Sequence, residues 1–209
     1  MKNAKGLINA SKKAVTVMFN DARLGKVVNP ETMMPLVEGI AASIDRNRAA
    51  LISLARLKTQ DDYTYMHSVA VCAMMTALAK ELELSDLEVK QSGLAGLLHD
   101  IGKMAVPLEV LNKPGALTDE EFLMIKQHPT KGHALLMKVD IKDTVVLDVC
   151  LHHHEKVDGT GYPEKLAGSN ISLFAKMGAI CDVYDAITSN HPYKAGWKPS
   201  VALQRMAQW

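Results

Sequence analysis

Residues 151–163 read Leu-His-His-His-Glu-Lys-Val-Asp-Gly-Thr-Gly-Tyr-Pro and hold the densest group of histidines in the chain. His153 and His154 both follow apolar residues at steps of four, which directs them toward the buried side of a predicted helix. His152 instead follows Asp148, on the polar side. A buried imidazole is costly unless its nitrogens are satisfied. A metal ion would satisfy both, because neutral imidazole is a common ligand; hydrogen-bonded core histidines are the alternative.

The pair His99-Asp100 follows the apolar run 94–98 and precedes Ile101-Gly102-Lys103. A carboxylate beside an imidazole can give one ligand to each of two metals, with Asp100 as the bridge. The same pair also arises as a simple hydrogen-bonded contact. Lys103 is either a surface lysine or a cation directed at a phosphate.

Four more residues are candidates for the same site. His67 lies on the apolar face of a predicted helix, where a lone histidine is more often a core residue than a ligand. His128 directly precedes Pro129, in a turn that breaks a helix. Asp182 and Asp185 share a helix face with small residues, and a carboxylate on such a packed face needs a partner. A helix cap or a salt bridge is the alternative for both aspartates.

Apolar residues recur at steps of three and four nearly throughout, which predicts an all-α protein. Three helices should begin at capping residues: at Asp61 or Asp62, at Ser85 and at Thr118. The remaining helices are expected over about residues 4–22, 31–57, 131–139, 141–156, 171–189 and 199–208. Two stretches rich in glycine and proline are expected to be irregular, namely about 104–117 and 157–170. The predicted organisation is a helical lead-in or linker over 1–58 and a compact domain over 59–209.

The 209-residue chain has a formal net charge of +1, so it offers no basic field to a long nucleic acid. No run approaches the ~18 apolar residues of a membrane span, and no signal peptide is recognisable, so we expect a cytoplasmic location. The cysteines Cys72, Cys150 and Cys181 follow no zinc or disulfide spacing and should be buried thiols. The chain ends within a predicted helix, so we expect a fragment of a longer protein.

The order of these residues resembles the HD-GYP family of bacterial phosphodiesterases, which belongs to the HD metal-dependent phosphohydrolases. The match comprises residues 99–103, His128-Pro129 with Gly132, residues 153–163 and Asp182-Val183-Tyr184-Asp185-Ala186. The resemblance covers about residue 60 to the end. It implies a compact HD-type helical domain that hydrolyses cyclic di-GMP to pGpG or GMP. It also implies a metal centre held by His67, His99, Asp100, His128, His153, His154 and Asp182.

Seven such ligands suit two transition metals with a bridging Asp100. One set would be His67, His99, Asp100 and Asp182, and the other Asp100, His128, His153 and His154. The resemblance favours iron or manganese, while nitrogen and oxygen ligands are also compatible with zinc, cobalt or nickel. Lys103 and Asp100 would be the catalytic side chains. Some family members carry a glutamate one helical turn before the first histidine, where it helps to bind a third ion; this chain has Tyr63 there.

By the same resemblance, Tyr162 contacts a guanine base and Lys194 a substrate phosphate. The predicted substrate contacts also include Gly161, Asp185 and His191. The chain departs from the family at Asn190-His191-Pro192-Tyr193, where the family usually has Asp-Arg-Pro-Tyr and the arginine binds a phosphate. The change keeps one alternative open, a cyclic di-GMP sensor that passes a signal to a protein partner. A second alternative is another HD hydrolase acting on nucleoside phosphates, which would share His99-Asp100 but would not require the Gly-Tyr-Pro loop.

Overall fold

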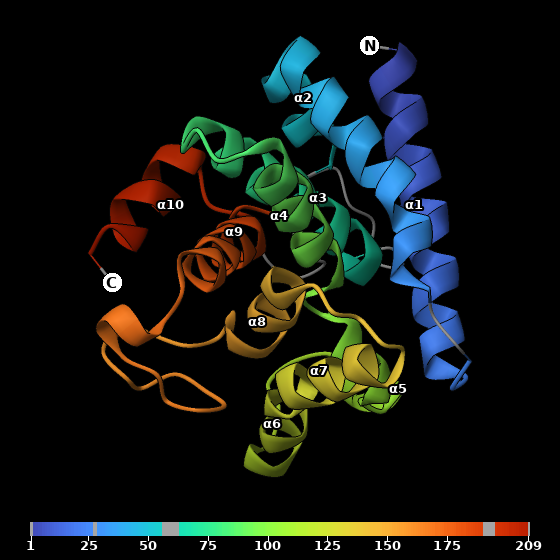
Figure 1. The fold of residues 1–209 in the computed structure, drawn as a ribbon. Helices are drawn as coiled ribbons and strands as arrows, with labels where there is room; N and C mark the ends of the chain where they lie inside the picture. The colour runs from blue at the N-terminus through green and yellow to red at the C-terminus, as the bar shows by residue number, and fades with distance from the viewer. Residues whose placement is uncertain (1, 27–28, 56–62, 190–194, 209) are drawn as a thin grey trace.

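The computed structural model describes residues 2–26, 29–55, 63–189 and 195–208, and these ranges contain helices and loops but no strand (Figure 1). The fold is all-α, as predicted. The α-helices are α1 (Lys2–Arg23), α2 (Met34–Ala55), α3 (Tyr63–Glu81), α4 (Asp86–Leu98), α5 (Leu108–Leu111), α6 (Asp119–Lys126), α7 (His128–Lys138), α8 (Thr144–His152), α9 (Leu173–Thr188) and α10 (Pro199–Met206). Three 3-10 helices are η1 (Pro30–Met33), η2 (Ile101–Ala105) and η3 (Gly168–Asn170).

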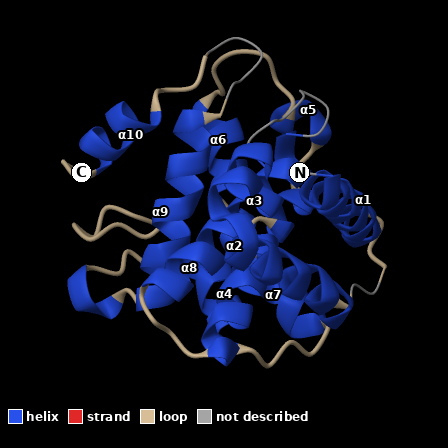
Figure 2. Ribbon diagram, turned by 90° about the horizontal axis from the view of Figure 1, so that it is seen from above, coloured by secondary structure: helices blue, strands red, loops and turns tan. Residues whose placement is uncertain are grey.

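Helices α3 and α4 form the centre of the molecule, and α1 and α10 lie on opposite sides of them (Figure 2). Residues 66–77 of α3 are all buried, which is expected of a helix that is apolar on every side. The two central helices approach closely at Gly96, where a Cβ atom would lie 3.0 Å from the backbone of Cys72. Helix α4 begins after the predicted cap Ser85, whose backbone N–H donates a hydrogen bond to the Glu88 carboxylate in a capping box.

The first two helices run side by side and pack against α3 (Figure 1). Val15, Phe19, Val37 and Ile40 from these helices are fully buried and join the same hydrophobic core as α3 and α4. The boundary predicted near residue 58 falls within 56–62, outside the described residues, and stays a prediction.

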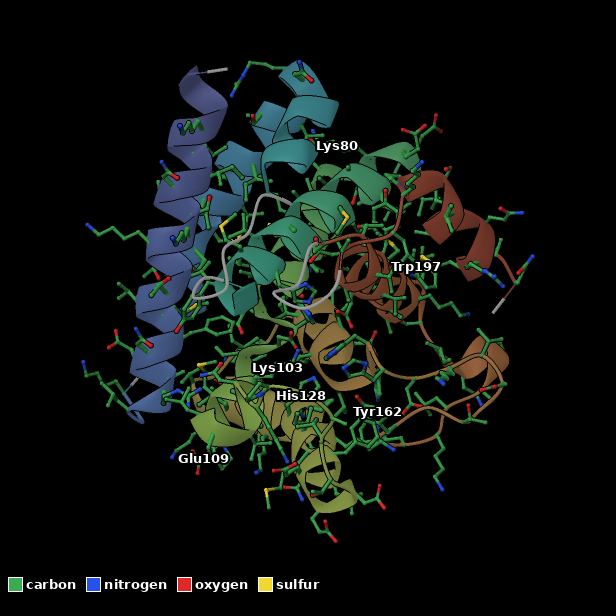
Figure 3. The ribbon with its side chains drawn as sticks, turned by 180° about the vertical axis from the view of Figure 1, so that it is seen from behind. Lys80, Lys103, Glu109, His128, Tyr162 and Trp197 are labelled. Atoms are coloured by element: carbon green, nitrogen blue, oxygen red, sulfur yellow. The ribbon has the colours of Figure 1, made fainter. Side chains whose placement is uncertain are left out.

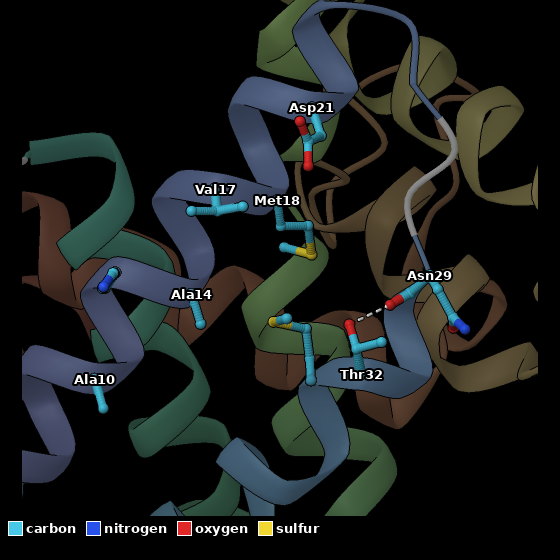
Figure 4. Close-up of a pocket in the computed structure, with 9 residues that line it drawn as sticks. Ala10, Ala14, Val17, Met18, Asp21, Asn29 and Thr32 are labelled. Atoms are coloured by element: carbon cyan, nitrogen blue, oxygen red, sulfur yellow. Dashed lines mark hydrogen bonds between the residues drawn. The ribbon is translucent and has the colours of Figure 1, made fainter.

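A hollow lies between α1 and the segment that leads into α2 (Figure 4). Its lining includes Ala14, Met18 and Met33, and Thr32 donates a hydrogen bond of 2.6 Å to the carbonyl of Asn29 at its edge. No candidate site residue lines this hollow.

The predicted helix over about 31–57 differs from the structure. A 3-10 turn, η1, precedes α2, and Asn47 within α2 has non-helical dihedral angles (φ −165°, ψ 87°). Pro35 accounts for the later start, because proline lacks the N–H that a helix needs beyond its first turn.

Around the candidate site, two predicted helix boundaries were wrong. Helix α7 begins at His128, with Pro129 in its first turn, rather than near residue 131. Helix α8 ends at His152 instead of continuing to about 156, because the chain turns at His153 toward the loop 157–170. The stretch 104–117, predicted to be irregular, contains the short helix α5.

Candidate metal centre

Five segments bring the seven predicted metal ligands together. His67 comes from α3, Asp182 from α9, and His128 from the first position of α7. The pair His99-Asp100 follows α4, and His153-His154 follows α8. All are buried except His154, which is half-buried. Figure 3 shows His128 with Lys103 and Tyr162 in one region of the molecule, while Lys80 and Trp197 lie away from it.

A glycine allows two of these segments to meet. A Cβ atom on Gly102, in η2, would lie 1.9 Å from the carbonyl oxygen of His128, so only glycine fits at this position. The close approach of η2 and α7 brings His128 beside Asp100, which directly precedes η2. The glycine two residues after Asp100 therefore has a steric reason.

Four of the histidines hold their Nδ1 atoms against acceptors behind the site. The partners are Gly96 O for His99 (2.8 Å), Ile125 O for His128 (2.7 Å), Val149 O for His153 (2.9 Å) and Asp185 Oδ2 for His67 (2.5 Å). An imidazole that donates from Nδ1 presents its Nε2 lone pair to the other side, as metal-bound histidines do. Local backbone carbonyls therefore set three of the rings in a metal-ligand orientation, and the Asp185 carboxylate sets that of His67.

The two carboxylate oxygens of Asp100 face different histidines. Oδ1 lies 3.2 Å from His128 Nε2 and 3.8 Å from His153 Nε2. Oδ2 lies 3.3 Å from His99 Nε2 and 3.6 Å from His67 Nε2. Asp100 thus stands between two groups of imidazoles, in the arrangement expected of a bridging ligand.

The donor set fits metal ions on three observations. The Nε2 of His99 and Oδ1 of Asp100 are buried and, within the described part of the chain, have no hydrogen-bond partner, which is costly unless a cation satisfies them. The Nε2 atoms of His128 and His153 lie only 3.1 Å apart, although each ring already uses Nδ1 as a donor. Ligand atoms within 4.8 Å of one another fall into groups that include His128-His153-His154 and His67-His99-Asp100. These two groups match parts of the two predicted sets, whereas a third group, His99-His153-Asp182, combines members of both.

Burial and neighbouring charges shift the pKa values of the histidines in the site. Burial lowers the pKa of His153 far below its usual value and that of His154 to about 3, so both rings are neutral near pH 7. Burial also lowers the pKa of His67, but the carboxylates of Asp182 and Asp185 outweigh it and raise this pKa to about 9.

Asp100 stays ionised despite its burial. Burial favours its neutral form, but Lys103, whose Nζ lies 2.6 Å from Oδ2, and the neighbouring histidines hold the pKa of Asp100 well below its usual range. The Lys103 side chain is 24% exposed, so it is less enclosed than that of Asp100, which is 1% exposed. The predicted pairing of Lys103 with a substrate phosphate is compatible with this position.

The Gly-Tyr-Pro loop lies beside the histidines. The ring of Tyr162 stacks on that of His154, with centroids 4.8 Å apart and planes at 26°. The Tyr162 N–H donates to the His154 carbonyl at 3.2 Å, and Gly161 of the same loop is buried against the backbone of Glu155 and Lys156.

The loop is anchored by Glu155, which our sequence reasoning did not assign. Its buried carboxylate accepts hydrogen bonds from the backbone N–H groups of Glu164 (2.7 Å) and Leu166 (3.1 Å). The available signal was a carboxylate directly after the buried histidines, at the point where the glycine-rich loop begins.

Asp185 lies elsewhere than predicted. Its side chain has no exposed surface and bonds to His67 from behind the metal-ligand cluster, so this position does not suit the substrate contact expected from the sequence. His191 and Lys194, the other two predicted contacts outside the loop, fall within 190–194, beyond the described residues.

The remaining predictions concern the rest of the chain. Cys72, Cys150 and Cys181 are buried free thiols, as expected. None of the described helices combines the length and apolar character required to cross a lipid bilayer.

Comparison with known proteins gives a consistent assignment. The model of the HD domain family matches residues 40–208. The chain is 56% identical over its full 209 residues to cyclic di-GMP phosphodiesterase PA4108 of Pseudomonas aeruginosa, of which it spans 50%. It is 39% identical over 161 residues, 76% of its length, to the cyclic di-GMP phosphodiesterase response regulator RpfG of Xanthomonas campestris, of which it spans 43%.

A further relative is the 3′3′-cGAMP-specific phosphodiesterase 1 of Vibrio cholerae, 39% identical over 145 residues, which are 69% of this chain and 33% of that protein. The chain thus spans half or less of these relatives. Among solved structures, Bd1817, an HDG"Y"P protein from Bdellovibrio bacteriovorus, matches 97% of this chain and 64% of its own with a TM-score of 0.73 at 20% identity, a likeness of fold. The chain therefore belongs to the HD domain family, and its resemblance to the HD-GYP type is confirmed.

Proposed function

We propose that this chain is a metal-dependent phosphodiesterase that hydrolyses cyclic di-GMP to pGpG or GMP. The observation that carries the proposal is the position of Asp100, whose two oxygens face two different groups of buried histidines. The full-length similarity to PA4108 supports the choice of substrate. Two transition metals, iron or manganese, would be held by the seven predicted ligands, with Asp100 shared between them.

Bound metals would supply a water of lowered pKa and a positive charge that stabilises the phosphoryl oxygens. The chain's own residues contribute position and charge. Asp100 remains ionised and available to both halves of the centre. Lys103, whose side chain is partly exposed, would pair with a phosphoryl oxygen of the substrate. Tyr162, which stacks on His154, would contact a guanine; burial raises the pKa of its phenol, so it remains a hydrogen-bond donor.

Further substrate contacts, the location and the partners of the chain are proposed from the sequence alone. His191 and Lys194 are proposed substrate contacts on the resemblance alone. A cytoplasmic location and a signalling protein partner also remain proposals. A sensor that binds cyclic di-GMP without cleaving it is the second candidate, since His191 stands where the family has a phosphate-binding arginine.

The direct test is to incubate the metal-loaded chain with cyclic di-GMP and to follow pGpG and GMP by chromatography. 3′3′-cGAMP assayed in parallel tests the substrate choice, because one relative is specific for that dinucleotide. We expect cleavage of cyclic di-GMP by wild-type protein and a loss of cleavage in Asp100→Ala. Binding of cyclic di-GMP without any product would refute the phosphodiesterase and support the sensor.

A further inference from the structure

Helix α6 exposes large apolar side chains to solvent. None of its eight residues is buried, and Phe122 is 47% and Leu123 60% exposed. The helix is nevertheless well built: Thr118 and Glu121 form a capping box, and Lys113 pairs with Glu121 at 2.6 Å. A firmly held helix with an open aromatic face is a feature typical of a binding surface.

The last turn of α6 connects this face to the metal centre. Lys126 places its Nζ 4.8 Å from the ring centroid of Phe122 and 5.2 Å from that of Tyr162. Tyr162 in turn stacks on His154, one of the candidate metal ligands. Figure 3 shows Tyr162 where the loop 157–170 passes α6 and α7. A cation between two aromatic rings thus lies directly outside the candidate site.

This arrangement matches the chemistry of the second half of a cyclic dinucleotide. In the proposed reaction, one phosphodiester bond is cleaved at the metal centre and the guanine of that nucleotide contacts Tyr162. The second guanine and the second phosphate must then lie further from the metals. Every purine offers a face that stacks on an exposed aromatic ring. A lysine supplies a compact positive charge to a phosphate, and it can exchange a cation–π contact for that ion pair.

We propose that Phe122 and Lys126, next to Tyr162, form a platform that binds the second guanine nucleotide half of the substrate. Phe122 stacks on the base and Lys126 pairs with the adjacent phosphate. The inference rests on the proposed function for the identity of the ligand. It adds a reason why the site takes a dinucleotide, because a simple phosphodiester would reach the metals without touching α6.

Binding and chemistry are measured separately to test the platform. Dissociation constants of a hydrolysis-resistant phosphorothioate analogue of cyclic di-GMP are compared for metal-loaded wild type, Phe122→Ala and Lys126→Gln. Turnover of bis(p-nitrophenyl) phosphate, a diester without guanine, reports on the metal centre. Leu123→Ala is the matched control, because Leu123 is the neighbouring exposed apolar residue on the same helix.

Phe122→Ala removes one base–aromatic stack and should raise the dissociation constant of the analogue between about fivefold and about 150-fold. Lys126→Gln should also weaken it, whereas Leu123→Ala should bind like wild type. All three variants should retain the metal content of wild type and its turnover of the simple diester. Wild-type affinity in both Phe122→Ala and Lys126→Gln would overturn the platform, as would an equal loss of activity on both substrates. Analogue binding without hydrolysis of cyclic di-GMP by wild type would refute the proposed function alone; no binding by wild type would overturn both.

Discussion

Replacing Asp185 should weaken metal binding, although its side chain is not among the predicted ligands. Its carboxylate accepts the Nδ1–H of His67 at 2.5 Å, between side chains that are 0% and 4% exposed. A hydrogen bond to a charged group contributes ~1.5–3 kcal/mol, and changes of such outer partners typically cost ~10–100-fold in metal affinity. We therefore expect Asp185→Ala to raise the dissociation constant by about 10–100-fold. Asp185→Asn should lose less, because its amide oxygen can still accept the bond.

A second effect opposes the first below pH 9. In metal-free protein, Asp185 helps to raise the pKa of His67 to about 9, so a proton competes with the metal near neutral pH. Asp185→Ala lowers this pKa and relieves the competition. The loss of affinity should consequently be larger at pH 9 than at pH 7, as measured by chelator competition at both values.

Asp148 provides a chemically matched control. Its carboxylate bonds to Nδ1 of His152 at 2.7 Å, but His152 is not part of the metal-ligand cluster. Asp148→Ala should leave metal affinity unchanged. Wild-type metal affinity in Asp185→Ala, with unchanged circular dichroism, would refute the role assigned to Asp185.

Three further predictions concern the centre and its substrate. Asp100→Ala should reduce metal content more than His67→Ala, since Asp100 faces both histidine groups; equal content in wild type and Asp100→Ala would exclude the bridge. Metal binding at pH 7 should release a proton from His67, and the calorimetric heat should vary with the ionisation enthalpy of the buffer; a buffer-independent heat would argue against this. His191→Arg should lower KM for cyclic di-GMP. The corresponding gain in binding free energy should be at most the ~1.5–3 kcal/mol of one charged hydrogen bond, and kcat should change less. An unchanged KM at equal metal content would place His191 outside the substrate site.

Much of the fold followed from helical periodicity and capping residues. Helices α4 and α6 begin after the capping residues Ser85 and Thr118 as predicted, because a cap is a local interaction between neighbouring residues. The C-terminal end of α8 and the start of α7 were predicted wrongly. Both depend on tertiary contacts: the close approach of Gly102 to His128, and the anchoring of the loop by Glu155.

The candidate site was predictable as a set of residues but not as a geometry. Taken alone, the position of His67 on an apolar helix face indicated a core residue. Only the order of His67 and the other histidines along the chain indicated a metal ligand. The sequence could not show that Asp185 lies behind His67 rather than at the substrate, since both aspartates of α9 share one face. Nor could it indicate that Lys126 of α6 lies over Tyr162, a contact between separate segments.

The most direct test of the central claim is a metal titration of the stripped chain, with the initial rate of cyclic di-GMP hydrolysis as the readout. We predict no hydrolysis without metal, and a rate that rises on addition of iron or manganese and saturates near two equivalents. A third equivalent should add nothing, because Tyr63 replaces the glutamate that helps to bind a third ion. Full activity in thoroughly stripped protein would contradict the account.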